Sequence, residues 1–298
     1  MRIASIIVTF NRSKLLIENI ESMLKMDGDF DIFVIDNAST DDTNEVLKDY
    51  IDNNKIKYVR LDNNIGGAGG FNFGIKYVTK LGYDYAYLVD DDVICNKDSL
   101  QKLVDYINTN KEKNIGFLSS KVLWKDDKLC NMNIPKRTMM KKIKDTSDIQ
   151  RIQYATFVSI LINIKAVKKL GLPIKEFFIW TDDFEYTRRI SKCFECFYIP
   201  SSVVIHNCEN NNGSNIVNTS VDRLDRFKYK YRNEQYVYKR EGIKGRIYQF
   251  LKVWYHILKV IIKSKEMKKE KIKIIINSNK EGKHFNPKIE MVEINEKA

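Results

Sequence analysis

The chain has 298 residues, of which 43% are hydrophobic and 30% are charged, and its formal net charge is +12. This composition is typical of a soluble globular protein, and the length suits one large domain with an appendage. It excludes a membrane-spanning class, because no run approaches the ~20 apolar residues that a span needs. It also excludes a disulfide framework, because the five cysteines are odd in number and irregularly spaced. Segment 1–14 turns polar too early for a signal peptide, so we expect a cytoplasmic protein.

Strand-like and helix-like segments alternate along the first third of the chain. The pattern predicts strands at 3–10, 31–36, 56–61 and 83–90. It predicts helices at 13–26, with Ser13 as N-cap, at 39–51, and from Gly70 or Phe71 to 81. Such alternation indicates βαβ units and a parallel sheet, in which ligands bind at the carboxyl ends of the strands. The polar clusters "TFNR", "DNAST", "DNNIGGAGG" and "DDD" all lie at such ends.

The rest of the chain is less regular. We expect strands at 115–124, 153–164 and 194–207, and a helix at 181–192 with Thr181 or Asp182 as N-cap. Segment 125–150 is polar and irregular, and helices dominate from about 222. Residues 221–270 contain 15 Lys and Arg against six Asp and Glu. We therefore divide the chain into an α/β domain at 1–220 and a basic helical region at 221–298, whose charge suits an anionic partner, either membrane lipid or nucleic acid.

Three aspartates, Asp90, Asp91 and Asp92, directly follow the predicted strand "YAYLV". Adjacent carboxylates repel one another, and a divalent cation such as Mg²⁺ or Mn²⁺ relieves that repulsion. Alternate residues of an extended chain point the same way, so Asp90 and Asp92 are expected to face one ligand. The alternative is a solvated acidic turn before a helix capped by Asp98; the sequence favours the metal.

Four of the 13 glycines fall within five residues, at Gly66, Gly67, Gly69 and Gly70. Glycine permits positive φ and lacks a Cβ, so the backbone N–H groups can face a phosphate or a sugar. The spacing matches neither the dinucleotide fingerprint nor a P-loop. A tight strand-to-helix turn is the alternative. Such a turn needs only one or two glycines, so we favour a ligand.

The segment "FIWTDDFEYTRRI" places Asp182 and Asp183 beside Trp180. A carboxylate there suits a general base, and the indole suits a sugar face. Ordinary first-turn acids, which complement the helix dipole, are the alternative and are preferred on these residues alone.

His206 ends an apolar extended run, where a lone histidine is usually structural. With Cys193, Cys196 and Cys208 it also offers a Zn²⁺ set with C-x₂-C spacing. The second half of that set, H-x-C, is atypical, so a plain strand is preferred.

In this order the clusters resemble the family 2 glycosyltransferases, which are inverting enzymes of the GT-A fold. "IVTFNR" is similar to the opening strand and loop of that family, and "VIDNASTDDT" to its nucleotide-contacting second strand. "DDD" is similar to its metal-binding D-x-D position, and "WTDDFEY" to the motif whose second acid is the catalytic base. The resemblance covers about residues 2–207. It implies a Rossmann-like, mainly parallel sheet flanked by helices, with a C-terminal helical appendage.

The resemblance also implies roles for individual residues. A UDP-sugar donor would lie across "TFNR" and "DNAS", with Asp36 or Asn37 near uridine, and Asp183 would be the base. Asp182 and Trp180 would position the acceptor. Asp90, Asp92 and His206 would hold Mn²⁺ or Mg²⁺. The nucleotide and donor would contact Thr9, Asn11, Arg12, Asp36, Asn37, Asn64, Gly66, Gly67, Gly69, Gly70, Asp90 and Asp91.

Within the family, "NNIGGAGGF" is similar to the N-x-G-G-x-G-G-F of galactofuranosyltransferases that use UDP-galactofuranose. The implied activity is galactofuranose transfer to a glycan or lipid-linked acceptor in bacterial surface polysaccharide synthesis, adding one or a few residues. The alternatives are dTDP-rhamnose or another nucleotide sugar as donor. A remote alternative is a nucleic-acid-binding protein, which leaves the acidic clusters unexplained, so no nucleic acid is expected. The sequence leaves open whether the chain forms a homo-oligomer.

The segment 245–270 mixes aromatic and aliphatic residues with a cationic stripe of Lys252, His256, Lys259 and Lys263. This pattern suits a helix lying on an anionic membrane at the inner face of the cell membrane. It equally suits a helix that packs its apolar side on protein, and the sequence does not decide between the two.

Overall fold

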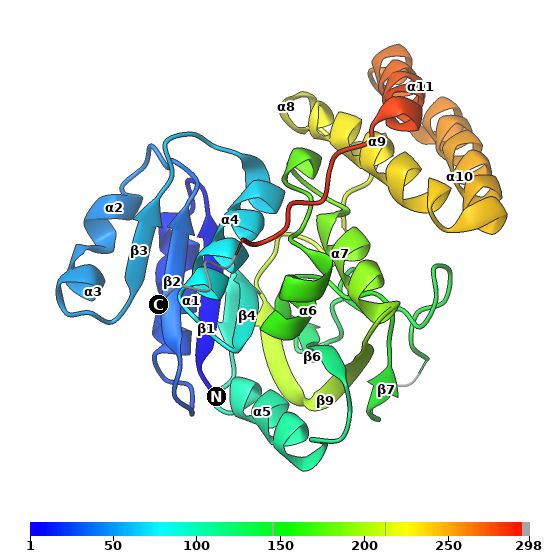
Figure 1. Ribbon diagram of the computed structural model, residues 1–298. Coiled ribbons are helices and arrows are strands. Elements are labelled where there is room, and N and C mark those ends of the chain that lie inside the picture. The colour runs from blue at the N-terminus through cyan, green and yellow to red at the C-terminus, as the bar shows by residue number, and fades with distance from the viewer. Residues whose placement is uncertain (145, 212, 294–298) are drawn as a thin grey trace.

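A nine-stranded sheet runs through the structure, a computed structural model that describes residues 1–144, 146–211 and 213–293 (Figure 1). The strand order is β3-β2-β1-β4-β8-β6-β9-β5, and β7 pairs with β9 outside this path. The strands are β1 (Ile3–Thr9), β2 (Asp31–Asp36), β3 (Lys57–Arg60), β4 (Tyr85–Asp90), β5 (Val93–Cys95), β6 (Ile115–Trp124), β7 (Gln150–Arg151), β8 (Ser159–Asn163) and β9 (Glu195–His206).

The strand register gathers the polar clusters at one edge of the sheet. Strands β3, β2, β1 and β4 are parallel, with Thr9 beside Asp36 and Val8 beside Asp90. Short β5 then pairs antiparallel with β9, and places Val93 opposite His206. The expected α/β class of the GT-A type is confirmed, with a parallel half-sheet that continues into a mixed one.

Helices cover both faces of the sheet. They are α1 (Ser13–Met23), α2 (Thr43–Val46), α3 (Lys48–Asp52), α4 (Gly66–Lys80), α5 (Ser99–Thr109), α6 (Ile164–Leu170), the 3₁₀ turns η1 (Lys175–Phe177) and η2 (Ile216–Asn218), α7 (Asp182–Ser191), α8 (Val221–Leu224), α9 (Arg226–Lys239), α10 (Gly242–Lys263) and α11 (Lys268–His284).

Each face of the sheet has its own apolar core, because successive strand residues point to opposite sides. Ile6 of β1 packs with Ile75 of α4, whereas Ile7 packs with Leu16 of α1. All four are fully buried, and burial of each such side chain contributes about 1.5–3 kcal/mol to stability. The two cores fix β1 and β4 in the middle of the molecule, and thereby the polar ends of these strands.

Three local expectations differ from the structure. Ser13 is the first residue of α1 rather than its N-cap, and its N–H is satisfied instead by Asp41 Oδ2 at 3.3 Å. The helix expected at 39–51 is interrupted at Leu47, which separates α2 from α3. The helix expected from Gly70 or Phe71 already begins at Gly66.

The C-terminal helices α9, α10 and α11 pack together beside α7 (Figure 1). Beyond α11 the chain runs back across α4, where the Leu172 N–H donates to the Glu290 carbonyl at 2.9 Å. Lys76 forms an ion pair with the Glu290 carboxylate at 2.6 Å. The boundary at 220 stays a prediction, and the two parts share these contacts. Within the described residues, every helix is too short or too polar to cross a bilayer.

Candidate active site

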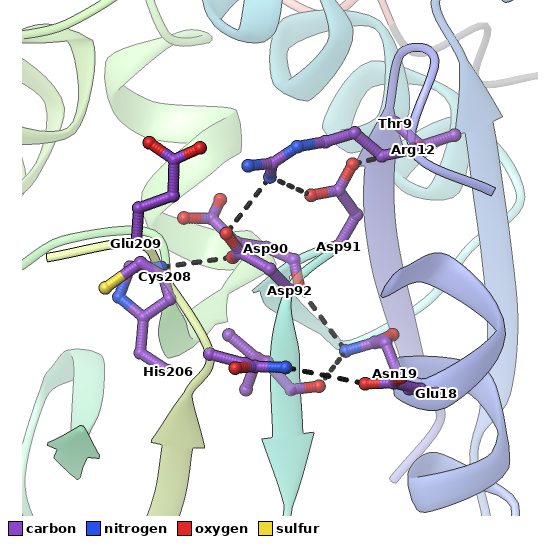
Figure 2. A network of polar contacts seen from close by, with 12 residues as sticks. Thr9, Arg12, Glu18, Asn19, Asp90, Asp91, Asp92, His206, Cys208 and Glu209 are labelled. Atoms are coloured by element: carbon purple, nitrogen blue, oxygen red, sulfur yellow. Dashed lines mark hydrogen bonds and ion pairs between the residues drawn. The ribbon is translucent and has the colours of Figure 1, made fainter. Parts of the chain in front are cut away.

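The turn after β4 brings two of the three aspartates together with His206. Asn19 of α1, which is fully buried, donates to the carbonyls of Asp90 and Val93 at 3.3 and 2.6 Å and so fixes the backbone of this turn. The Asn207 N–H donates to the Asp92 carbonyl at 2.8 Å. In this arrangement one ligand atom from each of Asp90, Asp92 and His206 lies within 4.8 Å of the others. Figure 2 shows the three side chains converging from β4, its turn and β9.

These three side chains fit a divalent cation. Asp92 Oδ1 lies 3.0 Å from His206 Nε2 and is buried with no other hydrogen-bond partner in the described chain. Burial and the adjacent Asp92 raise the pKa of Asp90 to about 7, as expected where carboxylates crowd without a cation. Burial lowers the pKa of His206, but the contact with Asp92 outweighs it and raises that pKa to about 12. Two carboxylates and an imidazole suit Mn²⁺ or Mg²⁺.

Asn133 fixes the orientation of the His206 ring. Its Oδ1 lies 2.9 Å from Nδ1, and its Nδ2 donates to Thr156 Oγ1 at 3.0 Å. With Nδ1 protonated and donating to Asn133, Nε2 is turned toward Asp90 and Asp92. An outer partner of this kind sets the tautomer of a metal-binding histidine. Asn133 lies in the irregular segment 125–150, where the sequence pattern did not indicate a role for it.

Asp91 has a different role from its neighbours. Its carboxylate accepts from Thr9 Oγ1 at 2.9 Å and from Arg12 at 2.7 Å, and Arg12 also reaches Asp92 Oδ2 at 3.0 Å (Figure 2). The carboxylates outweigh the desolvation of Arg12 and raise its pKa further. Asp91 thus holds the cationic side chain of Arg12 above the acidic turn, at the place where an anionic nucleotide is expected.

The loops after β1 and β2 form the wall expected to hold the nucleotide. Asn11 has a positive φ of 54°, and its side chain forms hydrogen bonds with Thr40 in the loop after β2. Asp36 is fully buried and already accepts from Tyr58 Oη at 2.6 Å and from the Ser39 N–H at 2.8 Å. The Asp36 side chain therefore shapes this wall from inside the protein.

Asn37 and Asn64 fix the start of α4. Asn37 accepts from the Ile65 N–H at 3.1 Å and donates to the Gly66 carbonyl at 2.8 Å. Asn64 Oδ1 accepts from the Gly66 N–H at 2.8 Å. Contacts of Asp36, Asn37 and Asn64 with a donor stay predictions.

Packing within the protein accounts for three of the four clustered glycines. At Gly66, with φ of 76°, a Cβ would lie 2.1 Å from the Phe178 carbonyl oxygen. At Gly69 it would meet Ile65, and at Gly70 it would lie 2.4 Å from Val8 in β1. Only Gly67 among the four has nothing within 4 Å of that position. The cluster therefore lets α4 pack closely on β1 and on the loop before α7, and Gly67 is the member with room for a ligand.

The acids of α7 follow a strained loop. Phe178, Trp180 and Thr181 all have positive φ, at 64°, 65° and 72°. Non-glycine residues in this region cost about 1–3 kcal/mol each and are found where surrounding contacts impose them. Asn233 of α9 holds the loop in this conformation. Its side-chain amide donates to the carbonyls of Phe177, Ile179 and Trp180 at 3.0, 3.2 and 3.0 Å.

Asp182 and Asp183 are desolvated at the start of α7. Burial raises the pKa of Asp182 to about 6. Burial, and then the neighbouring Asp182, raise the pKa of Asp183 well above the usual range of a carboxyl group, and Asp90 acts in the same direction. The field of Asp90 at Asp183 indicates that the two acidic clusters share one site. A carboxylate with a raised pKa suits a general base.

Lys136 is a neighbour of Asp183 that the sequence did not indicate. Burial, together with the nearby Lys252 and Lys142, lowers the pKa of Lys136 to about 8, although Glu234 and Asp183 oppose this shift. Its ammonium group lies 4.6 Å from the centre of the Phe184 ring. The irregular segment thus supplies both Asn133 and Lys136 to the site.

The alternative zinc set is not the one that the structure assembles. Cys193 is exposed, Cys196 is buried within β9, and in the described chain neither joins His206 at ligand distance. Cys130, which follows β6, takes their place beside His206 and Cys208.

Known proteins match parts of this sequence. Residues 5–171 match the family described as Glycosyl transferase family 2. The chain is 27% identical over 109 residues to a poly-beta-1,6-N-acetyl-D-glucosamine synthase of Staphylococcus epidermidis, which covers 36% of this chain and 26% of that protein. It is 29% identical over 93 residues to the galactofuranosyltransferase GlfT1 of Mycolicibacterium smegmatis, covering 30% of each chain. The match thus spans less than a third of the length of these relatives.

Solved structures share the fold over nearly the whole chain. The Staphylococcus aureus TarS structure has a TM-score of 0.58 at 15% identity and covers 94% of this chain and 43% of its own. GalNAc-T7 with UDP, GalNAc and Mn²⁺ has a TM-score of 0.64 at 16% identity, with 94% and 54% coverage. The mannosyltransferase PcManGT of Pyrobaculum calidifontis, in complex with GDP-Man and Mn²⁺, has a TM-score of 0.56 at 12% identity, with 93% and 73% coverage.

Proposed function

Because the chain belongs to glycosyl transferase family 2, we propose that it transfers galactofuranose from UDP-galactofuranose to a glycan acceptor, with inversion at the anomeric carbon. One observation carries the proposal: the Asp90, Asp92 and His206 cluster lies within electrostatic reach of the desolvated Asp183. One site can therefore stabilise the leaving diphosphate through the metal ligands and deprotonate the attacking hydroxyl through Asp183.

The residues divide the chemistry between them. Asp90, Asp92 and His206 Nε2 would hold Mn²⁺ or Mg²⁺, which offsets the negative charge that develops on the departing diphosphate. Arg12, held by Asp91, adds a fixed positive charge on the same side. Asp183 takes the proton of the acceptor hydroxyl while the oxygen of that hydroxyl forms the bond to the anomeric carbon. The bond from that carbon to UDP breaks in the same step, which inverts the configuration.

The donor assignment is supported by the similarity to GlfT1 over 93 residues and by Gly67, the one member of the glycine cluster that internal packing does not explain. At Gly67 a Cβ would meet no atom within 4 Å, and this open space at the start of α4 is where we propose that the donor sugar lies. UDP-N-acetylglucosamine is the second candidate. TarS, named as a beta-N-acetylglucosaminyltransferase, is 29% identical over 112 residues, and a TarS complex with UDP-GlcNAc has a TM-score of 0.54.

For the acceptor we propose a lipid-linked glycan, reached by a protein that rests on an anionic membrane through α10. The inner side of this helix packs on protein through Val253, Ile257 and Val260. Its outer side carries large apolar residues that are each 47–76% exposed. These are Ile243, Ile247, Phe250, Leu251, Trp254, Tyr255, Leu258, Ile261 and Ile262.

Charge favours a bilayer over a second copy of the chain as the occupant of this surface. Helix α10 contains five Lys and Arg and no Asp or Glu, but Lys252, expected in a cationic stripe, is ion-paired with Glu234 of α9 at 2.8 Å, so the other four carry the net charge of the helix. Two copies facing each other would oppose cations to cations, whereas anionic lipid attracts them at about 1 kcal/mol for each basic residue near the surface. Trp254 and Tyr255 suit the boundary between water and hydrocarbon.

Vesicle co-sedimentation tests the membrane contact. The protein should pellet with phosphatidylglycerol vesicles and remain free with phosphatidylcholine vesicles. A Phe250→Glu, Trp254→Glu double variant should lose this binding, while Met140→Glu, which changes an equally exposed apolar residue elsewhere, should keep it. A wild-type protein that ignores anionic vesicles, or that forms a dimer through α10, contradicts the assignment.

Release of the nucleoside diphosphate, which is UDP or dTDP according to the donor, tests the activity. UDP-galactofuranose, UDP-galactopyranose, UDP-N-acetylglucosamine and dTDP-rhamnose are each supplied with Mn²⁺ and a lipid-linked glycan, with and without chelator. We expect metal-dependent release from the furanose alone. Release from another donor would leave the mechanism standing and overturn the assignment of the donor.

A further inference from the structure

Two thiols flank His206 on the side away from Asp92. Cys130 is fully buried, and its Sγ lies 3.9 Å from His206 Nδ1. Cys208 is partly buried, and Figure 2 shows its sulfur beside the ring, opposite to the aspartates. One ligand atom from each of Cys130, Cys208 and His206 lies within 4.8 Å of the others. The proposed transfer reaction uses neither thiol.

This set differs chemically from the cluster of aspartates on the other side of the ring. Thiolates and imidazole select Zn²⁺ and similar soft cations, whereas carboxylates suit Mg²⁺ and Mn²⁺. Around a tetrahedral ion sulfur lies about 2.3 Å and nitrogen about 2.0 Å from the metal, so the ligand atoms would move somewhat closer together than the 3.9 Å between Cys130 Sγ and His206 Nδ1. The three ligands come from two neighbouring segments, because Cys130 follows β6 and Cys208 follows β9 two residues after His206. Asn133 Oδ1, which lies 2.9 Å from Nδ1, has to move aside for an ion to bind that nitrogen.

We propose that Cys130, Cys208 and His206 Nδ1 form a second metal site, selective for thiophilic divalent cations such as Zn²⁺, and that its occupation withdraws His206 from the Asp90 and Asp92 site. The claim that metal binding at this site inhibits transfer rests on the proposed function. The claim that the site binds a metal does not.

The competition follows from the chemistry of one imidazole ring. A neutral imidazole has a single nitrogen lone pair, so it can coordinate through Nδ1 or through Nε2 but not through both. Binding of Zn²⁺ at Nδ1 displaces the proton that Nδ1 shares with Asn133, and the two thiols lose their protons to solvent. Nε2 then keeps its proton and its 3.0 Å contact with Asp92 Oδ1. His206 then has no lone pair left for a cation held by Asp90 and Asp92.

Cadmium absorption tests the site directly, because Cd²⁺ bound to thiolates gives an ultraviolet charge-transfer band that binding to carboxylates does not give. Cd²⁺ alone is titrated into the full chain and into Cys130→Ser, Cys208→Ser and Cys193→Ser. The band should saturate at one equivalent in the wild type and in Cys193→Ser, whose cysteine is exposed and separate from the set. It should be lost in Cys130→Ser and Cys208→Ser. No band in the wild type, or loss of the band in Cys193→Ser, would overturn the site.

Folding of the serine variants is checked by circular dichroism and thermal unfolding. A wild-type melting temperature that rises with Zn²⁺, beside one that does not rise in a folded Cys130→Ser, supports the site independently of absorption. Equal rises in both proteins would overturn it.

Competition between the two sites is measured as the ratio of Mn²⁺-dependent UDP release with and without added Zn²⁺. We expect roughly tenfold inhibition in the wild type, the scale on which ligand perturbation changes metal sites, and at most a small effect in Cys130→Ser. Equal inhibition of both proteins would overturn the competition. If no donor is turned over, the proposed function fails, but the cadmium band still shows whether Cys130, Cys208 and His206 bind a metal.

Discussion

The side-chain amide of Asn233 donates to the Trp180 carbonyl at 3.0 Å. This bond joins α9, in the C-terminal helical region, to the loop that directly precedes Asp182 and Asp183. Asn233 is fully buried, and the same amide also reaches the carbonyls of Phe177 and Ile179. The C-terminal helices therefore hold the loop before α7 in its strained conformation, in addition to the membrane contact proposed for them.

Replacing Asn233 should affect both stability and turnover. Asn233→Ala leaves three loop carbonyls without this donor, and we expect a loss of about 1–3 kcal/mol in the free energy of unfolding. Because the loop positions the base, kcat should fall more than the donor KM rises. Urea denaturation and steady-state kinetics measure the two effects. Lys239→Ala, an exposed change on the same helix, is the control. A similar loss of stability and of kcat in both variants would show that the bonds from Asn233 to the loop are not responsible.

The glycine cluster offers a matched pair of variants. Gly66→Ala places a Cβ 2.1 Å from the Phe178 carbonyl oxygen at a positive φ, so it should destabilise the fold strongly. Gly67→Ala meets no atom within 4 Å and should leave the melting temperature unchanged within error. If the donor sugar lies above Gly67, the second variant should still lose turnover through a raised donor KM. Normal kinetics of Gly67→Ala would contradict the proposal that the donor sugar lies above Gly67.

The pH profile of transfer should reflect Asp183. The base must be deprotonated to accept the acceptor proton, and burial together with Asp182 raises its pKa. Turnover should therefore rise with pH and be lost as pH falls through this raised pKa, above the ordinary Asp range near ~4. Asp183→Asn should remove both turnover and this limb, while the circular dichroism spectrum stays unchanged. Normal turnover by that variant would show that another group is the base.

Asn133 should control metal affinity without touching the metal. Asn133→Leu removes the oxygen that fixes Nδ1 of His206, and we expect about 10–100-fold weaker Mn²⁺ binding. Isothermal titration in the presence of UDP measures the affinity. Asn131→Ala, at an exposed position two residues earlier, should bind Mn²⁺ as the wild type does. Equal affinities in the two variants would mean that the ring is oriented by other contacts.

Hydrophobic patterning was sufficient to predict the parallel half of the sheet and the strands β6 and β9. All of these except the partly exposed edge strand β3 are largely buried apolar runs, and Asp36, Asp90 and His206 are the last residues of β2, β4 and β9. The convergence of Asp90, Asp92 and His206 depends on β5, a three-residue strand that periodicity cannot detect. Asp90 and Asp92 do lie close together, but a turn at Asp91 and Asp92 brings them there and not the alternation of an extended chain.

The supporting residues could not be predicted from the sequence. Asn133, Lys136 and Cys130 lie in or beside an irregular segment whose path is set by tertiary contacts, such as the Lys136 N–H bond to the Tyr154 carbonyl at 2.9 Å. The glycine cluster was assigned to a ligand because the sequence does not show that Val8 and Phe178 press against it. Packing between segments far apart in the chain explains most of that pattern.

Electron paramagnetic resonance of Mn²⁺ binding in the presence of UDP tests the central claim most directly. The account predicts that wild-type protein binds one Mn²⁺, that Asp92→Asn binds it at least about tenfold more weakly while remaining folded, and that Asp62→Asn, an exposed acid near the same edge of the sheet, binds it normally. Wild-type affinity in a folded Asp92→Asn variant would contradict the assignment of Asp90, Asp92 and His206 as the metal ligands, and with it the proposed mechanism.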